Sequence, residues 1–347
     1  MKTARRERRS LLPRADAAAT ATLVSLDTEA AALRELRAAL SRSPPEIPCK
    51  YLYDDKGSAL FERITRLAEY FPTRTEQALL IDRAAAIVDA AGGPALTDVV
   101  ELGSGAASKT ACLLDAALAA GGRPRYVAVD ISAHALRRTR EILATCPEVT
   151  VEQVLADYTQ PFTLPPRPAG GRRLALFLGG TIGNDEDAEA IALLSRLREH
   201  LDAGDLLLLG ANLVTDPAAI HAAYNDAQGV TADFNRNLLH AVNAVARSSF
   251  EPQLFDHHAP YVVSRRRIEM WLVARQPMEV DLGRLGGTLR LGRGEGIRTE
   301  ISRRFQRDEV LRLLDAAGFT PQHWMESPDA RFGLALGSAR ASLRGLR

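Results

Sequence analysis

The stretch Val99-Val100-Glu101-Leu102-Gly103-Ser104-Gly105 joins an apolar strand to a loop of small residues, and Tyr126-Val127-Ala128-Val129-Asp130 is a second apolar strand that ends in an acid. We expect a helix between them. In an open α/β sheet this arrangement presents backbone N–H groups and one carboxylate to a cofactor that carries a nucleoside. The glycines allow close approach of the backbone, and the Asp130 carboxylate could accept both ribose hydroxyls.

The loop favours one cofactor over another. It reads Glu-Leu-Gly-Ser-Gly, without the third glycine of Gly-x-Gly-x-x-Gly, and Glu101 stands just before the first glycine. This suits S-adenosylmethionine, which has no pyrophosphate, better than a dinucleotide. Two alternatives stay open. One is a tight strand–helix turn with a capped helix and no ligand. The other is an oxidoreductase with a nucleotide cofactor, which the missing glycine disfavours.

Composition restricts the partners. The chain has 347 residues, of which 46% are hydrophobic and 25% charged, as is usual for a soluble protein of one large domain or two. Its 44 basic and 43 acidic residues give a formal net charge of +1, so no electrostatic footprint points to nucleic acid or to an anionic membrane. No apolar stretch approaches the roughly 20 residues of a membrane span. We therefore expect a small-molecule substrate.

The cysteines and the N-terminus indicate the compartment. Cys49, Cys112 and Cys146 are scattered, with neither metal-ligand spacing nor a disulfide framework. This fits a reducing cytosol, and we predict a cytoplasmic protein. Basic residues at 5–9 are followed by no apolar segment, which predicts a disordered tail over residues 1–20 rather than a signal peptide. An organelle transit peptide is the alternative.

Strands and helices alternate from about Thr97 to Gly210, which predicts a doubly wound parallel sheet. We expect strands at 97–102, 125–130, 150–155, 173–179 and 205–210, and helices at 108–119, 133–144 and 186–201. Beyond this alternation we expect helices at 25–41, 59–67, 216–247 and 307–317. We expect strands at 260–263, 267–274, 297–305 and 331–336. Residues 69–76 introduce one more helix, with Thr73 or Thr75 as its N-cap.

The break in alternation after Gly210 predicts a second domain inserted into the first. We expect residues 81–213 and 301–347 to bind the cofactor. Residues 21–80 and 214–300 would form an α+β domain that binds the substrate.

Ligands of open α/β sheets bind at the carboxyl ends of the strands. The first strand end offers Gly103, Gly105 and Lys109, and the third offers Asp157 and Tyr158. Asp157 could accept a hydrogen bond from the adenine amine, or could cap a turn. Lys109 lies where we expect the first turn of a helix, which is unfavourable for a cation. It is therefore predicted to pair with a carboxylate of the ligand, with a solvated surface position as the alternative.

The fourth strand end is Phe177-Leu178-Gly179-Gly180-Thr181-Ile182-Gly183-Asn184. Asn184 offers a donor and an acceptor, which suits the amine and carboxylate of an amino acid. A turn or N-cap asparagine is the alternative, because Asp185 and Glu186 start a helix.

In the expected strand at 297–302, alternation places Arg298, Glu300 and Ser302 on one face. Glu300 and Ser302 could bind a polar side chain that carries N–H groups, or could lie on a solvated face. Met270 by default belongs to the core, and Tyr53, Tyr70 and Tyr224 by default are half-buried packing residues. The histidines form neither a triad nor a metal site, and His257-His258 is expected in a loop.

The chain resembles the S-adenosylmethionine-dependent histidine N-alpha-methyltransferases of ergothioneine biosynthesis, over about residues 25 to 340. The resemblance is supported by the Glu101–Gly105 loop, by the segments 223–226 and 229–232, and by six further motifs that occur in the same order. These motifs are Tyr53-Asp54-Asp55-Lys56-Gly57-Ser58 with Phe61-Glu62, Glu69-Tyr70-Phe71-Pro72-Thr73-Arg74-Thr75-Glu76, Gly180-Thr181-Ile182-Gly183-Asn184, Phe234-Asn235-Arg236-Asn237, Arg267-Ile268-Glu269-Met270 and Thr299-Glu300-Ile301-Ser302.

The resemblance implies a Rossmann-like class I methyltransferase sheet with a second, substrate-binding domain. It implies that methyl groups pass from S-adenosylmethionine to the α-amino group of histidine, up to trimethylation. It assigns the cofactor to Gly103, Gly105, Lys109, Asp130, Asp157 and Tyr158. It assigns the amino-acid backbone to Tyr53, Tyr70, Asn184 and Tyr224, with Asn184 and Tyr53 as catalytic residues, and the side-chain pocket to Met270, Glu300 and Ser302.

Two departures from the family pattern concern the surroundings of the amine. The chain has Gly210-Ala211-Asn212-Leu213-Val214-Thr215 where relatives commonly have Gly-x-Asp-Leu-Val-Lys. Acidic residues follow Asn184 in place of an apolar residue and a proline. Other substrates of this fold stay open: a tryptophan derivative, tyrosine or arginine, or cofactor binding without turnover. We expect a monomer.

Overall fold

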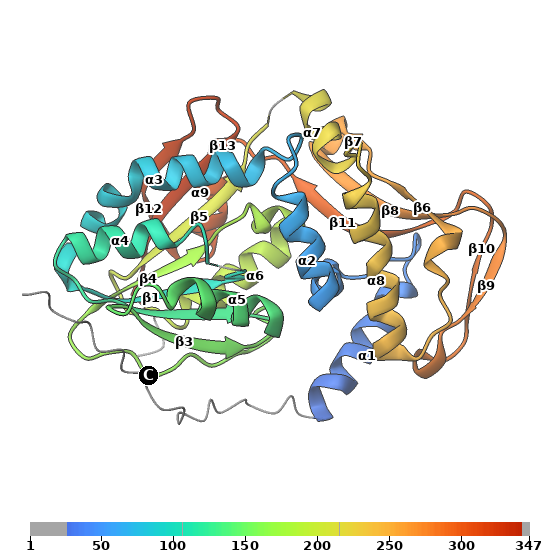
Figure 1. Ribbon diagram of the computed structural model, residues 1–347, viewed down its shortest axis with the longest axis horizontal. Coiled ribbons are helices and arrows are strands. Elements are labelled where there is room, and N and C mark those ends of the chain that lie inside the picture. Colours follow the sequence, from blue (N-terminus) through green and yellow to red (C-terminus); the bar gives the residue numbers. More distant parts are fainter. Residues whose placement is uncertain (1–25, 106, 215, 342–347) are drawn as a thin grey trace, which may run out of the picture.

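The long apolar runs form a seven-stranded sheet, and a smaller β-rich part lies beside it (Figure 1). This computed structural model describes residues 26–105, 107–214 and 216–341. The tail expected over residues 1–20 lies outside these ranges. The doubly wound α/β architecture predicted from the sequence is confirmed.

The large sheet has the strand order β12-β13-β5-β4-β1-β2-β3. The five strands from β3 to β5 are parallel, whereas β13 runs antiparallel to β5 and to β12. The strands are β1 (Leu96–Leu102), β2 (Arg125–Asp130), β3 (Thr150–Leu155), β4 (Arg172–Phe177), β5 (Leu206–Asn212), β12 (Phe319–Glu326) and β13 (Phe332–Ala339).

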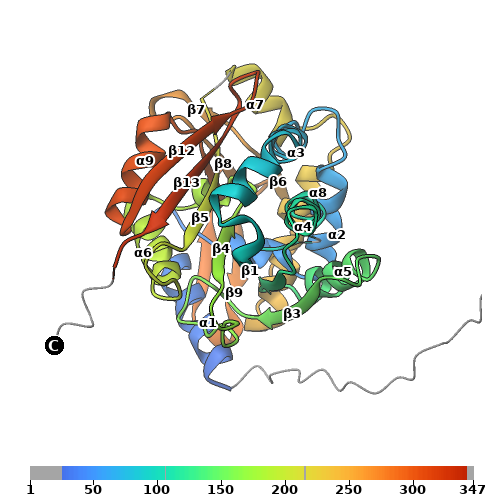
Figure 2. The same ribbon diagram turned by 90° about the vertical axis from the view of Figure 1, so that its left-hand side faces the viewer.

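Helices cover both faces of this sheet, as Figure 2 shows in a view along it. The leucine run in β5 divides between them: Leu206 and Leu208 pack in the core beneath α3 and α4, and Leu207 and Leu209 in the core beneath α6 and α9. A parallel strand buried on both faces requires such a run. The helices are α3 (Pro72–Ala90), α4 (Ala111–Ala119), α5 (Ala133–Leu143), α6 (Asp187–Arg198) and α9 (Arg307–Ala316).

The smaller part has its own core, in which α1, α2 and α8 pack against a four-stranded sheet. Leu36, Ile64, Leu238 and Ile268 are among its buried residues. Its helices are α1 (Leu26–Leu40), α2 (Asp55–Ile64), α7 (Pro217–Tyr224) and α8 (Val230–Ala246), and its strands are β6 (Phe255–His258), β7 (Tyr261–Val262), β8 (Arg267–Ala274), β9 (Met278–Asp281), β10 (Thr288–Leu291) and β11 (Gly296–Arg303).

Two local predictions for the smaller part are wrong. The helix expected over 216–247 is broken into α7 and α8, because Gly229 has a positive φ of 70° and the Asp226 carboxylate accepts hydrogen bonds from the first backbone N–H groups of α8. His257 and His258 lie on β6 and pair with β8, not in a loop. Burial lowers the pKa of His257, whose ring nitrogens contact Tyr224 O and Asn235 Nδ2.

A third local prediction concerns the start of α3. Neither Thr73 nor Thr75 caps this helix. Phe71 is its N-cap residue and Pro72 is its first residue, a position where the missing N–H of proline costs nothing.

Strand β11 crosses the expected domain boundary between residues 300 and 301. It pairs with β8 from Gly296 to Arg303, so residues 301–303 share a sheet with the second part of the chain. The division into a cofactor domain and a substrate domain stays a proposal.

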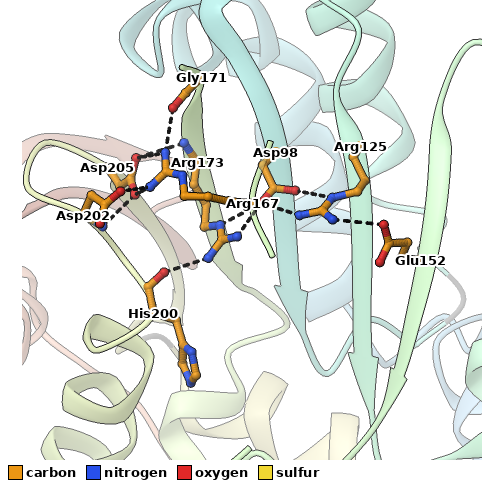
Figure 3. A network of polar contacts seen from close by, with 9 residues as sticks. All are labelled: Asp98, Arg125, Glu152, Arg167, Gly171, Arg173, His200, Asp202 and Asp205. Atoms are coloured by element: carbon orange, nitrogen blue, oxygen red, sulfur yellow. Dashed lines mark hydrogen bonds and ion pairs between the residues drawn. The ribbon is translucent and has the colours of Figure 1, made fainter. Parts of the chain in front are cut away.

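At the amino ends of the parallel strands, a buried network of charges joins β1, β2 and β4 (Figure 3). The fully buried Asp98 carboxylate accepts hydrogen bonds from Arg125 Nε at 2.9 Å and Arg173 Nε at 2.8 Å. Arg125 also pairs with Glu152 of β3 at 3.0 Å. This network holds the strands at the end of the sheet opposite to their carboxyl ends.

We predict that Asp98→Ala lowers the free energy of unfolding by about 3–5 kcal/mol, because it leaves two arginines without their buried partner. Urea unfolding measures this loss. The matched control is Glu279→Ala, which breaks the exposed Glu279–Arg290 pair and should leave the free energy of unfolding nearly unchanged, because solvent screens this pair. Equal losses for the two variants would contradict a structural role for Asp98.

Candidate active site

A cavity lies between the carboxyl ends of β1 to β4 and the second part of the chain. All of the site residues predicted from the sequence line it, although their roles stay predictions. They are Tyr53, Tyr70, Gly103, Gly105, Lys109, Asp130, Asp157, Tyr158, Asn184, Tyr224, Met270, Glu300 and Ser302.

At the end of β2, the Asp130 carboxylate is held in place by the backbone. Its Oδ1 accepts from Ser132 N at 2.8 Å and its Oδ2 from Gly105 N at 3.0 Å. Burial raises the pKa of Asp130, and hydrogen bonds from the backbone N–H groups of Ser132, Gly105 and Ile131 oppose that shift. A carboxylate has about four acceptor sites, so Asp130 keeps acceptor capacity for the ribose of a cofactor.

The glycine loop after β1 leaves room for a ligand. Gly103 and Gly105 have positive φ angles of 67° and 52°, and no heavy atom lies within 4 Å of where a Gly105 Cβ would stand. Ser104 Oγ is buried without a hydrogen-bond partner among the described residues. Open space, unused polar capacity and the fixed Asp130 together fit S-adenosylmethionine at this end of the cavity.

Glu101, the acid before the first glycine, has a structural task in this loop. Its Oε2 accepts from Thr110 Oγ1 at 2.6 Å and from the hydroxyl of Tyr126. These bonds join the end of β1 to β2 and to the start of α4. Burial raises the pKa of Glu101 to about 7, against the effect of both donors.

Lys109 pairs with a carboxylate of the protein. It precedes α4, which begins at Ala111, and its ammonium contacts Glu76 of α3. The fully buried Glu76 also accepts a hydrogen bond from Gly179 N at 2.6 Å. An ammonium has further donors, so a ligand carboxylate as an additional partner of Lys109 stays a prediction. Glu76 was not singled out from the sequence, because its partners lie far away in the chain.

Asp157, after β3, is tied to the second part of the chain. Its Oδ2 lies 2.6 Å from Nζ of Lys50, which also pairs with Glu35 at 2.6 Å, and its Oδ1 accepts from Thr159 N at 2.9 Å. Nothing in the local sequence singled out Lys50. An adenine amine at Asp157 would share this carboxylate with it.

Asn184 ends a short 3₁₀ helix, Thr181–Asn184. The N-cap residue of α6 is Glu186, so Asn184 is no helix cap. Its Nδ2 lies 3.8 Å from Cys49 Sγ, and its oxygen accepts no hydrogen bond from the described residues. Gly180, at the start of this 3₁₀ helix, has a positive φ of 67°, and a Cβ there would also fall 2.1 Å from Asn212 Nδ2, so this position favours glycine.

Glu300 and Ser302 share the wall of the cavity with Met270, but Arg298 does not face the same way. A bulge at Thr299 changes the register between Arg298 and Glu300, which turns the Arg298 side chain toward Glu46 and Glu269. The alternation expected for this strand is therefore wrong at Arg298. Met270 is only 1% exposed and belongs to the core of the smaller part as well.

The Glu300 carboxylate is 9% exposed and accepts no hydrogen bond from any residue that the structure describes. Burial raises its pKa to about 7, and the positive charge of Arg304 opposes the shift. A buried acceptor without a donor has capacity left for a ligand that carries an N–H group.

Aromatic rings surround the space between the two ends of the cavity. Tyr53 makes edge contacts with Phe61 and Phe234, at centroid distances of 5.5 and 5.6 Å. Tyr70 makes them with Phe61 and Tyr224, both at 6.2 Å. Phe61 and Phe234 stand in the quoted motifs but were not predicted as site residues, because an apolar side chain in a helix by default belongs to the core.

Two kinds of feature are absent from the described part of the chain. No group of three or more histidine, cysteine or acidic side chains in residues 26–105, 107–214 and 216–341 is arranged to hold a metal ion. No helix in these ranges is long and apolar enough to cross a membrane.

The sheet order and its glycine and aspartate strand ends define an S-adenosylmethionine-dependent methyltransferase of the Rossmann-like class. More closely, the chain belongs to the family of histidine-specific, S-adenosylmethionine-dependent methyltransferases, whose model matches residues 32–339.

Two relatives, both histidine N-alpha-methyltransferases, agree with this assignment. The histidine N-alpha-methyltransferase of Mycolicibacterium smegmatis is 42% identical over 318 residues, which cover 91% of this chain and 98% of that protein. The protein of the same name from Mycobacterium tuberculosis is 40% identical over 304 residues, 87% of this chain and 93% of that protein. Among solved structures, an S-adenosylmethionine-dependent methyltransferase from Clostridium acetobutylicum matches with a TM-score of 0.44 and 10% identity, over 77% of this chain and 92% of that one.

The raised pKa of Glu300 predicts a pH-dependent stability. The folded protein binds a proton at Glu300 more tightly than the unfolded chain, whose carboxyl has the ordinary value of 4.5. The free energy of unfolding therefore falls as the pH rises from 4.5 to about 7. Above that range Glu300 is fully ionised, and its burial costs no further stability as the pH rises. Glu300→Gln removes the charge and should stabilise the ligand-free protein by on the order of 3 kcal/mol at neutral and higher pH.

Thermal unfolding at about pH 8 and about pH 5 measures this difference, which should be smaller at the lower pH. Glu279→Gln, at an exposed position, is the control and should leave both transitions unchanged. A wild-type protein more stable than Glu300→Gln at the higher pH would show that Glu300 is not a buried, unsatisfied charge.

Proposed function

We propose that this chain transfers methyl groups from S-adenosylmethionine to the α-amino group of L-histidine, in three rounds that give the trimethylated betaine hercynine. The main support for this proposal is that a single cavity has two chemically different ends, one suited to the cofactor and one to the substrate. One end has the glycine loop and Asp130, and the other has Glu300 and Ser302. The family membership and the names of the relatives support the same substrate.

In the proposed mechanism, the cofactor supplies a methyl group that its sulfonium already activates. The residues of the chain then have to align the amine with it. Asn184 and Tyr53 orient the amine lone pair. Holding both reactants in a near-attack geometry supplies roughly 7–11 kcal/mol of barrier reduction. Burial raises the pKa of Tyr53 well above its usual value, so its phenol stays neutral and the proton of the amine passes to water.

The aromatic rings explain how three methyl groups are accommodated. Each transfer makes the amine larger and less polar, and the third leaves a permanent cation. The faces of Tyr53, Tyr70 and Phe61 attract a quaternary ammonium group by about 0.5–2 kcal/mol without needing a hydrogen bond.

We further propose a monomeric enzyme in the cytoplasm. The three free thiols suit a reducing compartment, and the balanced charge offers nothing that would attract nucleic acid.

The proposal is tested by incubating the protein with S-adenosylmethionine and single amino acids, and by mass spectrometry of the products. Histidine should gain one, two and finally three methyl groups, whereas tryptophan, tyrosine and arginine should stay unmodified. Methylation of another amino acid would refute the substrate. Calorimetric binding of S-adenosylhomocysteine without any methylated product would instead reveal a binding module without turnover.

A matched variant tests the role of Asn184 in the same assay. Asn184→Ala should slow turnover by about 100-fold, because a misplaced amine loses its alignment with the methyl group. Its affinity for S-adenosylhomocysteine should stay that of the wild type. Unchanged turnover would remove Asn184 from the mechanism.

A further inference from the structure

Arg304 is a buried cation without an acidic partner. It is 2% exposed, and no carboxylate in the described ranges of the chain forms an ion pair with it. Sequence reasoning did not single it out, and it does not line the cavity itself. A buried guanidinium is costly unless its donors are used, so its hydrogen bonds indicate its task.

Besides a bond from Nη1 to the backbone oxygen of Arg303 at 3.3 Å, those hydrogen bonds go to the two hydroxyl groups at the substrate end of the cavity. Nη1 of Arg304 donates to Ser302 Oγ at 3.0 Å, and its Nη2 donates to the Tyr224 hydroxyl at 3.4 Å. The guanidinium also lies over the Tyr224 ring, 5.6 Å from its centroid. Tyr224 in turn donates to Ser302 Oγ at 2.7 Å.

These contacts determine the direction of the remaining hydrogen bond of Ser302. A serine hydroxyl has two acceptor lone pairs and one donor hydrogen. Arg304 and Tyr224 occupy both lone pairs, so the hydrogen of Ser302 is the only polar capacity that it can offer to a ligand. Because an arginine has no acceptor and cannot lose its proton, the bond from Arg304 to Ser302 cannot reverse, and it favours the arrangement in which Ser302 donates to a ligand.

Glu300 offers a hydrogen-bond acceptor to a ligand, whereas Ser302 offers a donor. Its carboxylate is free of protein donors and accepts an N–H when it is ionised. The titratable groups that interact with it electrostatically are Cys49, Tyr53, Tyr70 and Arg304, and of these only Arg304 is positively charged. Arg304 therefore favours the ionised, accepting form of Glu300 and the donating form of Ser302 together.

We propose that Arg304 is a specificity-determining positioning residue, which makes the pocket select a neutral ring with one N–H for Glu300 and one bare nitrogen for Ser302. This inference rests on the proposed function, since an imidazole in its neutral state is such a ring. An imidazolium has no bare nitrogen, and an indole offers an N–H alone.

The test compares two ligands by calorimetry in the presence of S-adenosylhomocysteine. One is histidine, and the other is 2-pyrrolylalanine, which has a ring N–H but no bare ring nitrogen. The wild type should prefer histidine by about 10- to 100-fold, because the analogue leaves the Ser302 donor unmatched. In Arg304→Met the lone pairs of Ser302 are no longer both occupied, its hydroxyl can turn, and the preference should fall to within about threefold.

Two further variants separate this role from a structural one. Arg304→Lys keeps a buried donor and should restore part of the preference. Arg303→Met removes the neighbouring arginine, which contacts Asp187 and the Phe305 ring instead, and should leave the preference unchanged. A loss of affinity for both ligands by the same factor in Arg304→Met, with the preference intact, would overturn the proposal.

A further measurement uses the wild-type protein alone, so its result does not depend on whether a variant folds. In ¹⁵N NMR spectra of ring-labelled histidine bound at a pH of about 8, where Glu300 is ionised, the ring should hold one protonated and one bare nitrogen in a single fixed tautomer. A bound imidazolium would refute the proposal. If the wild type binds histidine and the analogue equally, the specificity proposal fails. If it does not bind histidine at all, the proposed function itself fails, and this outcome is distinct from the others.

Discussion

The parallel arrangement of β1 to β4 brings their carboxyl ends to one edge of the sheet, and the rest of the site is built against that edge. The strand order leaves backbone N–H groups, a fixed carboxylate and open space at the same place. The second part of the chain closes the space from the other side with Tyr224, Met270 and Glu300. Lys50 and Asp157 join the two sides directly.

Buried carboxylates at the two ends of the sheet differ in the hydrogen-bond donors that they have. At the amino ends, Asp98 has a full set of arginine donors, so its charge is satisfied and strengthens the fold. At the cavity, Glu300 has no donor and its burial costs stability. A carboxylate kept unsatisfied in this way is available to a ligand, which is the usual relation between stability and function in a binding site.

The sequence predicted those elements that local pattern determines. The apolar runs of β2 and β3 are confirmed at residues 125–130 and 150–155, and the glycine loop lies where the strand–helix alternation required it. Strands β6, β9, β10 and β12 were missed, because short or edge strands with many polar residues lack a clear apolar period. The bulge at Thr299 was missed because the alternating pattern continues through it.

The missed site residues share another cause. Lys50, Glu76 and Arg304 contact partners that are distant in the chain, and no local pattern records such pairs. The family motifs contained Glu76, Phe61 and Phe234 without indicating what each does. Only the folded chain shows that Arg304 lies behind Ser302 and Tyr224, or that Lys109 is held by a buried acid.

The most direct test of the two-ended site is a crystal structure with S-adenosylhomocysteine and histidine bound together. We predict the ribose hydroxyls on Asp130, and the imidazole nitrogens about 2.7–3.2 Å from the Glu300 carboxylate and from Ser302 Oγ, with the α-amine at Asn184. A histidine bound with its carboxylate toward Ser302 and its ring away from Glu300 would contradict the account.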